Sequence, residues 1–600
     1  MPRRAERWLA LQPRESREHL EAFAAGINAF AREHPELIGD SVRAVLPVTA
    51  TDVIEHWERI QYSAFLTGKD RVRGETRTWV PPGSNAWAVA PNRTADGHTL
   101  LLANPHLRWS DVFTWFEAQY TAPGIDVSGA ALVLSPVLEI AFNDRLGWTH
   151  TVNTQDGVDL YELTLTPGGY AWNGGTRQFD VSTHVLRVRR NDGSYRPDTL
   201  VVRQSVHGPV VASKPGRVIA LSVVGLHGPE LPLAYEQWWQ MGRARSLPEF
   251  QAAVRGNQVS GFNIIYGDRD GHIMMSYGGN TPERSGGDAS SWSGIVRGDT
   301  SATLWHRLLP VDELPRVIDP STGWVQNANE APWWATYPLD AHVDRYPAYV
   351  APAGLPLRPQ ESMRLLMRDS AWSFEQFLRA ANSTHLILAD RVVDELVRDG
   401  HASRRVETQH AADILRDWDR SADADSRGGV LFVEWWGQYQ RLASRGKVFR
   451  RSWDAREPLT TPAGLGDSIA AIAALDSATA SLLQRFGRID VAWGDAYRLR
   501  RDGEDLPMSG APGELGTFHV VYYDRQTDGR LAAVSGTSFV FAAEFGPTVR
   551  AVTLLGYGNS SRPGSSHRSD QLSLLAGKRF KPAWRSRDDV IAHLERREVP

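Results

Sequence analysis

The order of predicted strands and helices constrains the fold of this 600-residue chain more than any other feature. Residues 84–285 are rich in strand patterns, residues 372–490 follow a helical period, and strand patterns return after Pro507. This order could mean two separate domains. It could also mean one α+β fold in which a helical insertion interrupts the strands of a common core.

Composition limits the kinds of partner. Hydrophobic residues make up 42% and charged residues 23%, which is typical of a globular protein, and the net charge of -4 predicts no nucleic-acid partner. There is no cysteine, which excludes disulfides, thiolate nucleophiles and cysteine-bound metals. No apolar run has transmembrane length, so we expect no membrane partner. The N-terminus has no apolar stretch typical of a signal peptide, so the chain as given is expected to be cytoplasmic.

A serine stands where a stiff approach enters a predicted hairpin. Two prolines and Gly83 precede Ser84, and the alternating strand that follows returns through a turn at 96–97. Serine at such a junction can attack the carbonyl of Gly83. Cleavage would give Ser84 a free α-amino group, with a pKa of about 7.7–8, beside its own hydroxyl. That amine could serve as the base for the hydroxyl. The alternative is an ordinary turn residue.

Several motifs carry a family resemblance. Residues 83–87 (GSNAW) and 101–106 (LLANPH) resemble the β-chain start of the penicillin acylase family, whose members are N-terminal-nucleophile (Ntn) hydrolases. The resemblance continues at 262–268 (FNIIYGD), 323–329 (GWVQNAN) and 556–560 (GYGNS). It covers nearly the whole chain. The branch of glutaryl-cephalosporin acylases looks nearest, and acyl-homoserine-lactone acylases are near relatives.

The resemblance implies an α+β fold, a four-layer αββα Ntn-hydrolase sandwich with a helical insertion at about 372–490. It implies self-cleavage between Gly83 and Ser84. Residues 1–83 would then be a short α-chain segment with a spacer-like loop at about 67–83, and residues 84–600 the β chain. The expected product is an α/β heterodimer from one precursor, which could form a higher oligomer. Family members are usually exported, so the resemblance implies a periplasmic or secreted protein.

The resemblance also assigns catalytic roles. Ser84 would be the nucleophile and, through its new amine, the base. His106 would lie near it, oriented by Glu544, because a carboxylate in an apolar strand is costly unless it is paired. The backbone N–H of Val152 and the side-chain amide of Asn263 would form the oxyanion hole. No cofactor is expected for catalysis.

The predicted substrate pocket departs from that of the glutaryl acylases. Their substrate-reading arginine corresponds to Glu139, and a nearby tyrosine corresponds to Trp115. A carboxylate there would repel an acidic acyl group, so we expect neutral or amine-bearing acyl groups. Glu139 pointing away from the pocket is the alternative. Arg284 matches an arginine that supports the pocket by its charge, although it could be an ordinary loop residue.

A structural calcium ion is a further possibility. Asp156, Val158 and Asp159 resemble the calcium-binding stretch of penicillin G acylase, and two carboxylates with one carbonyl suit a hard cation. Acidic turns without a metal are the alternative.

The leading hypothesis is therefore a penicillin/cephalosporin acylase-like amidase that acts on small-molecule acyl amides through an acyl-enzyme on Ser84. An acyl-homoserine-lactone acylase is one alternative. A truncated relative that only binds acylated ligands is another. A conventional serine hydrolase is disfavoured because no Gly-x-Ser-x-Gly elbow is tied to a strand–helix turn.

Overall fold

A computed structural model describes residues 2–67, 83–339, 343–443 and 447–597. Its centre is a ten-stranded sheet in which strands from both ends of the chain pair with one another. This sheet contains β1 (Gly83–Val89), β2 (Thr99–Arg108), β18 (Trp324–Asn327), β21 (Tyr497–Arg501), β22 (Glu504–Pro507), β23 (Val521–Arg525), β24 (Leu531–Thr537), β25 (Phe539–Phe545), β26 (Val549–Leu555) and β27 (Lys581–Pro582). Because β2 pairs with β24 and β25, the two strand-rich regions share one sheet.

A seven-stranded sheet lies against it. Its strands are β3 (Trp115–Ala122), β4 (Ile125–Leu132), β5 (Ile140–Phe142), β6 (Leu146–Val152), β14 (Phe262–Asp268), β15 (Ile273–Tyr277) and β17 (Arg316–Ile318). Between the sheets, the rings of Phe142 and Phe541 stack with centroids 4.8 Å apart. A Cβ on Gly147 would come within 3.0 Å of Leu101, so a glycine is needed where the sheets approach.

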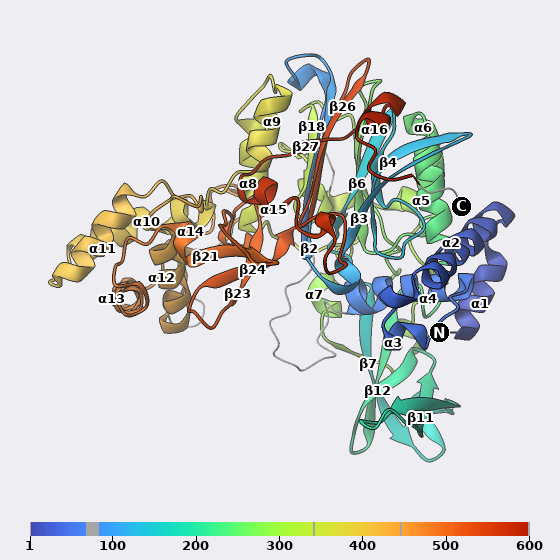
Figure 1. The fold of residues 1–600 in the computed structure, drawn as a ribbon. Coiled ribbons are helices and arrows are strands. Elements are labelled where there is room, and N and C mark those ends of the chain that lie inside the picture. The colour runs from blue at the N-terminus through green and yellow to red at the C-terminus, as the bar shows by residue number, and fades with distance from the viewer. Residues whose placement is uncertain (1, 68–82, 340–342, 444–446, 598–600) are drawn as a thin grey trace.

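Helices cover both outer faces and complete four layers, as Figure 1 shows. The seven-stranded sheet is covered by α5 (Ala234–Arg243) and α6 (Leu247–Val254), and Phe250 packs against Trp148. On the other side, α8 (Leu357–Met367) and α9 (Phe374–Ala381) cover the ten-stranded sheet, where Phe377 packs against Trp87. The predicted αββα sandwich is therefore present.

The predicted helical region forms an arm at one side of the sandwich (Figure 1). It contains α10 (Ile387–His401), α11 (Val406–Asp417), α12 (Gly429–Leu442) and α13 (Ser468–Phe486) around a core of their own, and β19 (Phe449–Arg451) pairs with β20 (Ala463–Leu465). Among the residues described here, no helix is long and apolar enough to cross a bilayer.

The N-terminal helices lie beside the covering helices of the seven-stranded sheet. They are α1 (Pro2–Leu11), α2 (Arg14–Glu33), α3 (Asp40–Arg43) and α4 (Ala50–Glu58), followed by the π-helical η2 (Arg59–Leu66). Trp57 of α4 meets Trp238 of α5 edge to face at 4.9 Å. On α2, the buried face includes Leu20 and Ala24.

A third sheet of eight strands projects from the sandwich (Figure 1). It contains β7 (Val158–Thr166), β8 (Gly169–Trp172), β9 (Gly175–Arg177), β10 (Asp180–Arg189), β11 (Tyr195–Ser205), β12 (Gly208–Lys214), β13 (Arg217–Val223) and β16 (Ile295–Arg297). Sequence patterns located several of these strands but did not separate them from the sandwich, because alternation does not reveal which strands pair.

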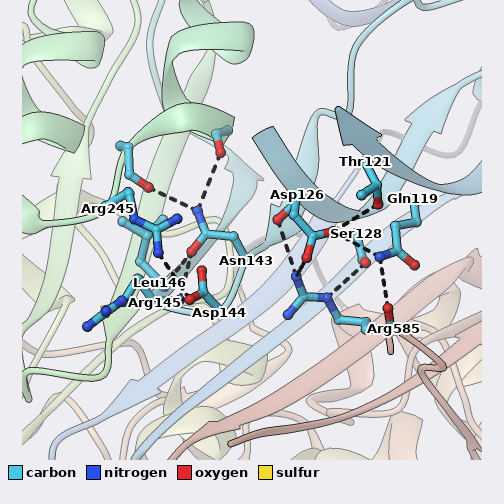
Figure 2. Close-up of polar contacts among 12 residues, drawn as sticks. Gln119, Thr121, Asp126, Ser128, Asn143, Asp144, Arg145, Leu146, Arg245 and Arg585 are labelled. Atoms are coloured by element: carbon cyan, nitrogen blue, oxygen red, sulfur yellow. Dashed lines mark hydrogen bonds and ion pairs between the residues drawn. The ribbon is translucent and has the colours of Figure 1, made fainter. Parts of the chain in front are cut away.

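Polar contacts connect the C-terminal segment to the seven-stranded sheet (Figure 2). Arg585 donates to the Ser128 hydroxyl at 3.0 Å and contacts the Asp126 carboxylate at 3.3 Å. In the same view, the Asn143 side chain accepts from the N–H of Leu146 and donates to a carbonyl at the end of α5. These bonds hold the turn that leads into β6.

Candidate active site

Ser84 lies at the start of β1 with its hydroxyl against the peptide bond predicted to be cut. The side chain is 3% exposed. Its Oγ donates to the carbonyl oxygen of Gly83 at 2.5 Å. Pairing of β1 with β2 places Gly83 opposite His106 and Ser84 opposite Pro105. The hydroxyl, the scissile carbonyl and a histidine are therefore brought together by strand pairing.

A side chain at Gly83 would crowd a neighbour. A Cβ at this position would lie 3.1 Å from Oδ1 of Asn329 and 3.7 Å from Nδ1 of His106. The predicted spacer at about 67–83 lies outside the described residues except for its two ends.

Asn329 is the amide that contacts the nucleophile. Its Oδ1 accepts from the N–H of Ser84 at 2.7 Å, and its Nδ2 donates to the carbonyl of Val152 at 2.6 Å. Its φ of 69° lies in the left-handed region, which asparagine tolerates better than most residues. Asn329 is the last residue of the family motif at 323–329, but the sequence alone assigned it no role. The strained backbone that marks it is visible only in the fold.

Arg358, at the start of α8, holds the backbone around the nucleophile. One guanidinium nitrogen donates to the carbonyl of Ser84 at 2.7 Å and to Oδ1 of Asn85 at 2.6 Å. The other donates to Oδ1 of Asn329 at 2.7 Å. Sequence analysis missed Arg358, because it lies far along the chain in a helix with no distinguishing motif.

The backbone of Val152 points toward this group. Val152 lies opposite Phe262, and the next pair is hydrogen-bonded, with the N–H of Asn153 donating to Gly261 at 3.0 Å. In an antiparallel ladder, bonded and non-bonded pairs alternate. The N–H and carbonyl of Val152 therefore face away from β14, and the carbonyl meets Asn329. This orientation suits the predicted oxyanion donor.

Asn263 has a different environment from the one predicted. Its Nδ2 donates to the hydroxyl of Thr151 at 3.0 Å and to Oδ1 of Asn327 at 3.1 Å. Both amide protons are committed, and within the described contacts Asn263 makes no hydrogen bond to Ser84. The amide next to the nucleophile is therefore that of Asn329. The geometry does not support Asn263 as an oxyanion donor.

His106 is buried beside the nucleophile. In the described part of the chain its Nε2 has no hydrogen-bond partner. Burial, with the nearby charges of Arg358 and His519, lowers the pKa of His106 well below its usual range. The ring is therefore neutral at physiological pH and can accept a proton or a hydrogen bond at one nitrogen.

The predicted pairing of Glu544 with His106 is wrong. On β2, Glu544 lies opposite Leu100, whereas His106 lies opposite Thr537. Glu544 instead approaches Nδ1 of His98 at 3.6 Å and Arg550 at 4.0 Å. Six residues of extended strand span about 20 Å, so the register excludes direct contact.

Two pockets meet at the Gly83–Ser84 bond. The apolar pocket includes Ser84 and is lined mainly by Trp57, Phe65, Trp115, Leu132, Ile140, Trp238 and Phe262. The polar pocket includes Gly83 and is lined by His106, Asn153, Asn329, Arg358, Glu514 and Tyr522, among others. Val152 lines both. The apolar pocket has a volume of about 30 Å³ and the polar pocket about 300 Å³, so the serine has a narrow apolar space on one side and a wider polar space on the other.

Trp115 and Glu139 line the apolar pocket that contains Ser84. Glu139 is 4% exposed, and its Oε1 has no hydrogen-bond partner among the described residues. Burial raises the pKa of Glu139 to about 8. The carboxyl group is therefore mainly protonated at neutral pH.

Arg284 does not line either pocket. Its buried guanidinium contacts Asp159 at 3.0 Å and Asp156 at 3.3 Å, and it lies over the ring of Trp292 at 4.8 Å. The prediction that it supports the substrate pocket is wrong, because its charge is used by two carboxylates elsewhere.

The same ion pairs argue against the predicted calcium site. The guanidinium of Arg284 stands against both Asp156 and Asp159, where a cation would have to bind, and it also donates to the carbonyl of Asp156. No cluster of three or more His, Asp or Glu side chains able to hold a metal occurs in the described ranges. Asp156, Val158 and Asp159 therefore do not fit calcium, since the protein supplies its own cation there.

An αββα sandwich whose first core strand begins with a buried serine, its hydroxyl against the preceding carbonyl, defines an N-terminal-nucleophile hydrolase. The penicillin amidase family model matches residues 1–592, and the chain belongs to this family. It is a hydrolase that acts on amide bonds.

Relatives agree with this assignment. An acyl-homoserine lactone acylase PvdQ from Pseudomonas putida is 28% identical over 100% of this chain and 84% of its own length. Aculeacin-A acylase from Actinoplanes utahensis is 26% identical over 83% of this chain and 67% of its own. A thermostable penicillin G acylase from Alcaligenes faecalis shares the fold, with a TM-score of 0.64 and 18% identity over 86% of this chain and 99% of its own.

Proposed function

We propose that this protein cleaves itself between Gly83 and Ser84 and then hydrolyses small-molecule N-acyl amides through an acyl-enzyme on Ser84. The observation that carries the proposal is the position of the Ser84 hydroxyl, against the Gly83 carbonyl and at the boundary of an apolar and a polar pocket. The product would be an α/β heterodimer.

Self-cleavage needs only groups already in place. The Ser84 hydroxyl attacks the Gly83 carbonyl carbon and an ester bond to Oγ forms. The Oγ proton passes to the peptide nitrogen, and the C–N bond breaks to give the amine of Ser84. Asn329 holds the departing nitrogen, and Arg358 holds the next carbonyl. Water then hydrolyses the ester, leaving a carboxylate on Gly83 and a free amine on Ser84.

The free amine then serves the catalytic cycle. It takes the proton from Oγ as Oγ attacks the substrate carbonyl. We assign the developing oxyanion to the N–H of Val152, whose backbone faces away from β14, and to the second Nδ2 proton of Asn329, whose Oδ1 accepts from Ser84 and whose Nδ2 also donates to the Val152 carbonyl. The proton passes to the leaving amine, and water hydrolyses the acyl-enzyme. The acyl group would occupy the apolar pocket and the leaving amine the polar pocket, near His106.

Two substrate classes follow. Side-chain amides of β-lactams suit an apolar acyl group joined to a polar amine. N-acyl homoserine lactones likewise join an apolar acyl group to a polar amine. Relatives named acyl-homoserine lactone acylase match along the whole chain and favour this class. A non-catalytic, acyl-binding chain is the competing hypothesis, and it predicts no cleavage and no turnover.

Electrophoresis and N-terminal sequencing test the cleavage. The wild type should separate into fragments of residues 1–83 and 84–600, and Ser84→Ala should remain a single chain. A large fragment that begins at another residue would contradict the proposal. Release of free amine from a panel of N-acyl amides then separates an enzyme from a binding protein.

A variant pair tests the oxyanion assignment. Asn329→Ala should reduce kcat by about 10²–10³-fold, as expected for loss of one oxyanion donor. Asn263→Ala, a buried asparagine held by other partners, should lose less than tenfold once kcat is expressed per cleaved, folded molecule. Equal losses in both variants would return Asn263 to the site.

A further inference from the structure

The backbone of Glu139 is held firmly at the wall of the apolar pocket. Its N–H donates to the carbonyl of Ala130 at 3.0 Å, and its carbonyl accepts from the indole of Trp148 at 2.9 Å. These bonds fix the position of the residue just before β5. The side chain lines the same pocket as Ser84.

The ring nitrogens of His150 and the indoles of Trp238 and Trp115 in this pocket are already paired. Nε2 of His150 accepts from the indole of Trp238 at 2.8 Å, so Nδ1 carries the proton and donates to the carbonyl of Asn263 at 3.1 Å. The indole of Trp115 donates to Ser538 at 3.1 Å. Glu139 is different, because its Oε1 is buried and lacks a partner in the described part of the protein.

A buried acceptor without a partner is costly, since it has lost water and gained nothing in return. The Ser135 hydroxyl and the Leu132 backbone hydrogen-bond the carboxyl group of Glu139, while its Oε1 keeps no partner among the described residues. The missing donor can come from a group that enters the pocket, and the group that enters during the proposed reaction is the acyl chain of the substrate.

We propose that Glu139 determines substrate specificity by binding a hydrogen-bond donor, above all a primary ammonium group, on the acyl chain of the substrate. This inference rests on the proposed amide hydrolysis at Ser84. The substrate class is thus an amide whose acyl group is apolar next to the scissile bond and carries an amine further along.

Charge decides which donor binds best. An alkyl terminus would leave Oε1 unpaired, and a hydroxyl would give one neutral hydrogen bond. An ammonium group gives a hydrogen bond and an ion pair in a low-dielectric pocket, where both are stronger than in water. In that complex Glu139 is ionised. Its proton has either left to solvent or moved to a neutral amine, which then binds as an ammonium group.

A length series tests this proposal. Amides with one shared leaving group are prepared with acyl chains of increasing length, each ending either in an amine or in a methyl group of equal size. For the wild type, kcat/KM for the amine member should exceed that of its methyl partner by tenfold or more at one length and fall off on both sides.

Variants identify the residue that reads the amine. Glu139→Gln should abolish the preference, so that the amine-ended and methyl-ended members of each length give kcat/KM values within about threefold of each other. Glu139→Asp, which is shorter by one methylene, should move the optimum to a chain longer by one methylene. Glu407→Gln, at an exposed site on α11, is the matched control and should change neither the preference nor its optimum.

Outcomes that overturn the inference are distinct from those that overturn the function. Hydrolysis without an amine preference at any length, or a preference unchanged in Glu139→Gln, would overturn it while leaving amide hydrolysis intact. If no amide is hydrolysed, the proposed function fails. Calorimetry then decides the inference separately, because amine-ended amides must still bind more tightly than methyl-ended ones, and only when Glu139 is present.

Discussion

Two buried carboxylates of this protein have opposite surroundings. Asp159 is fully buried, and its oxygens accept from Arg284 at 3.0 Å and from the indole of Trp305 at 2.8 Å. Glu139 is almost as buried, yet its Oε1 has no partner among the described residues. One lies outside both pockets at the base of the projecting sheet, and the other lines the pocket that contains Ser84.

The comparison distinguishes a buried carboxylate that stabilises the fold from one that is available to a ligand. A paired carboxylate with satisfied oxygens has nothing left to offer a ligand, whereas an unpaired one keeps a hydrogen-bonding site that a ligand can fill. Sequence analysis placed Arg284 and Glu139 together as pocket residues. The structure divides them, and the following tests address that division.

The largest effect is expected from removing the cation of the paired site. Arg284→Ala should lower the free energy of unfolding by about 3–5 kcal/mol, because it leaves buried Asp159 without its partner. Urea denaturation measures the loss. Activity per folded molecule should be unchanged. Arg307→Ala, which breaks an exposed pair with Glu283, is the control and should cost at most about 1 kcal/mol.

A charge reversal in the pocket should change specificity instead. Glu139→Arg should raise the ratio of kcat/KM for a glutaryl amide over a neutral amide of equal length by about 10–100-fold, as a close charge contact of a few kcal/mol in a partly screened site implies. Glu139→Gln separates loss of the carboxyl group from gain of the cation. An unmoved ratio would mean that Glu139 does not meet the acyl chain.

The pH dependence of stability should show the unpaired carboxyl group. The pKa of Glu139 is raised from 4.5 to about 8, so between these values the folded state holds a proton that the unfolded state releases. Its contribution is full below pH 4.5 and is lost as pH rises to 8. The stability of wild type relative to Glu139→Gln should therefore fall across this window.

Neighbouring groups do not imitate this signal. Burial lowers the pKa of His150 from 6.5 to about 4, so its unfolded form takes up a proton within this window, but both proteins share this contribution and it cancels in their difference. Burial raises the pKa of Tyr120 and Tyr235 above the usual tyrosine value. Thermal melts of both proteins between pH 4.5 and 9 measure the difference. Parallel profiles would show that Glu139 stays ionised in the folded protein.

A small effect is expected at the third carboxylate. Glu544→Ala should change kcat by less than about threefold, because Glu544 pairs loosely with His98 and Arg550 at the far end of β2. His106→Ala should be much more damaging. Comparable losses in the two single variants, with no further loss in the double variant, would restore the partnership predicted from sequence.

No effect is expected from removing divalent metals. Arg284 already supplies the positive charge between Asp156 and Asp159. Dialysis against a chelator should leave melting temperature and turnover of the matured protein unchanged. Recovery of lost stability by calcium alone would contradict the ion-pair assignment.

Local patterns predicted a large part of the fold. The helix Ser468–Phe486 lies inside the helical region predicted at 372–490, and the strand Val549–Leu555 lies in the strand-rich region predicted after Pro507, because each depends on the spacing of apolar residues in one short segment. In that second region, the strand after Phe518 begins only at Val521. Phe518 is drawn away to stack on Trp87 at 4.3 Å, a contact that no local pattern contains.

Through its family resemblance, the sequence indicated the αββα class and the serine at the head of the first core strand, and it showed a carboxylate, Glu139, within an apolar segment. The tertiary structure alone decided which polar groups meet. Asn329 and Arg358 reach Ser84 across 245 and 274 residues of chain, and strand register carries Glu544 away from His106. Register and long-range contact arise from the whole packed core, so short patterns predict the elements and not their polar partners.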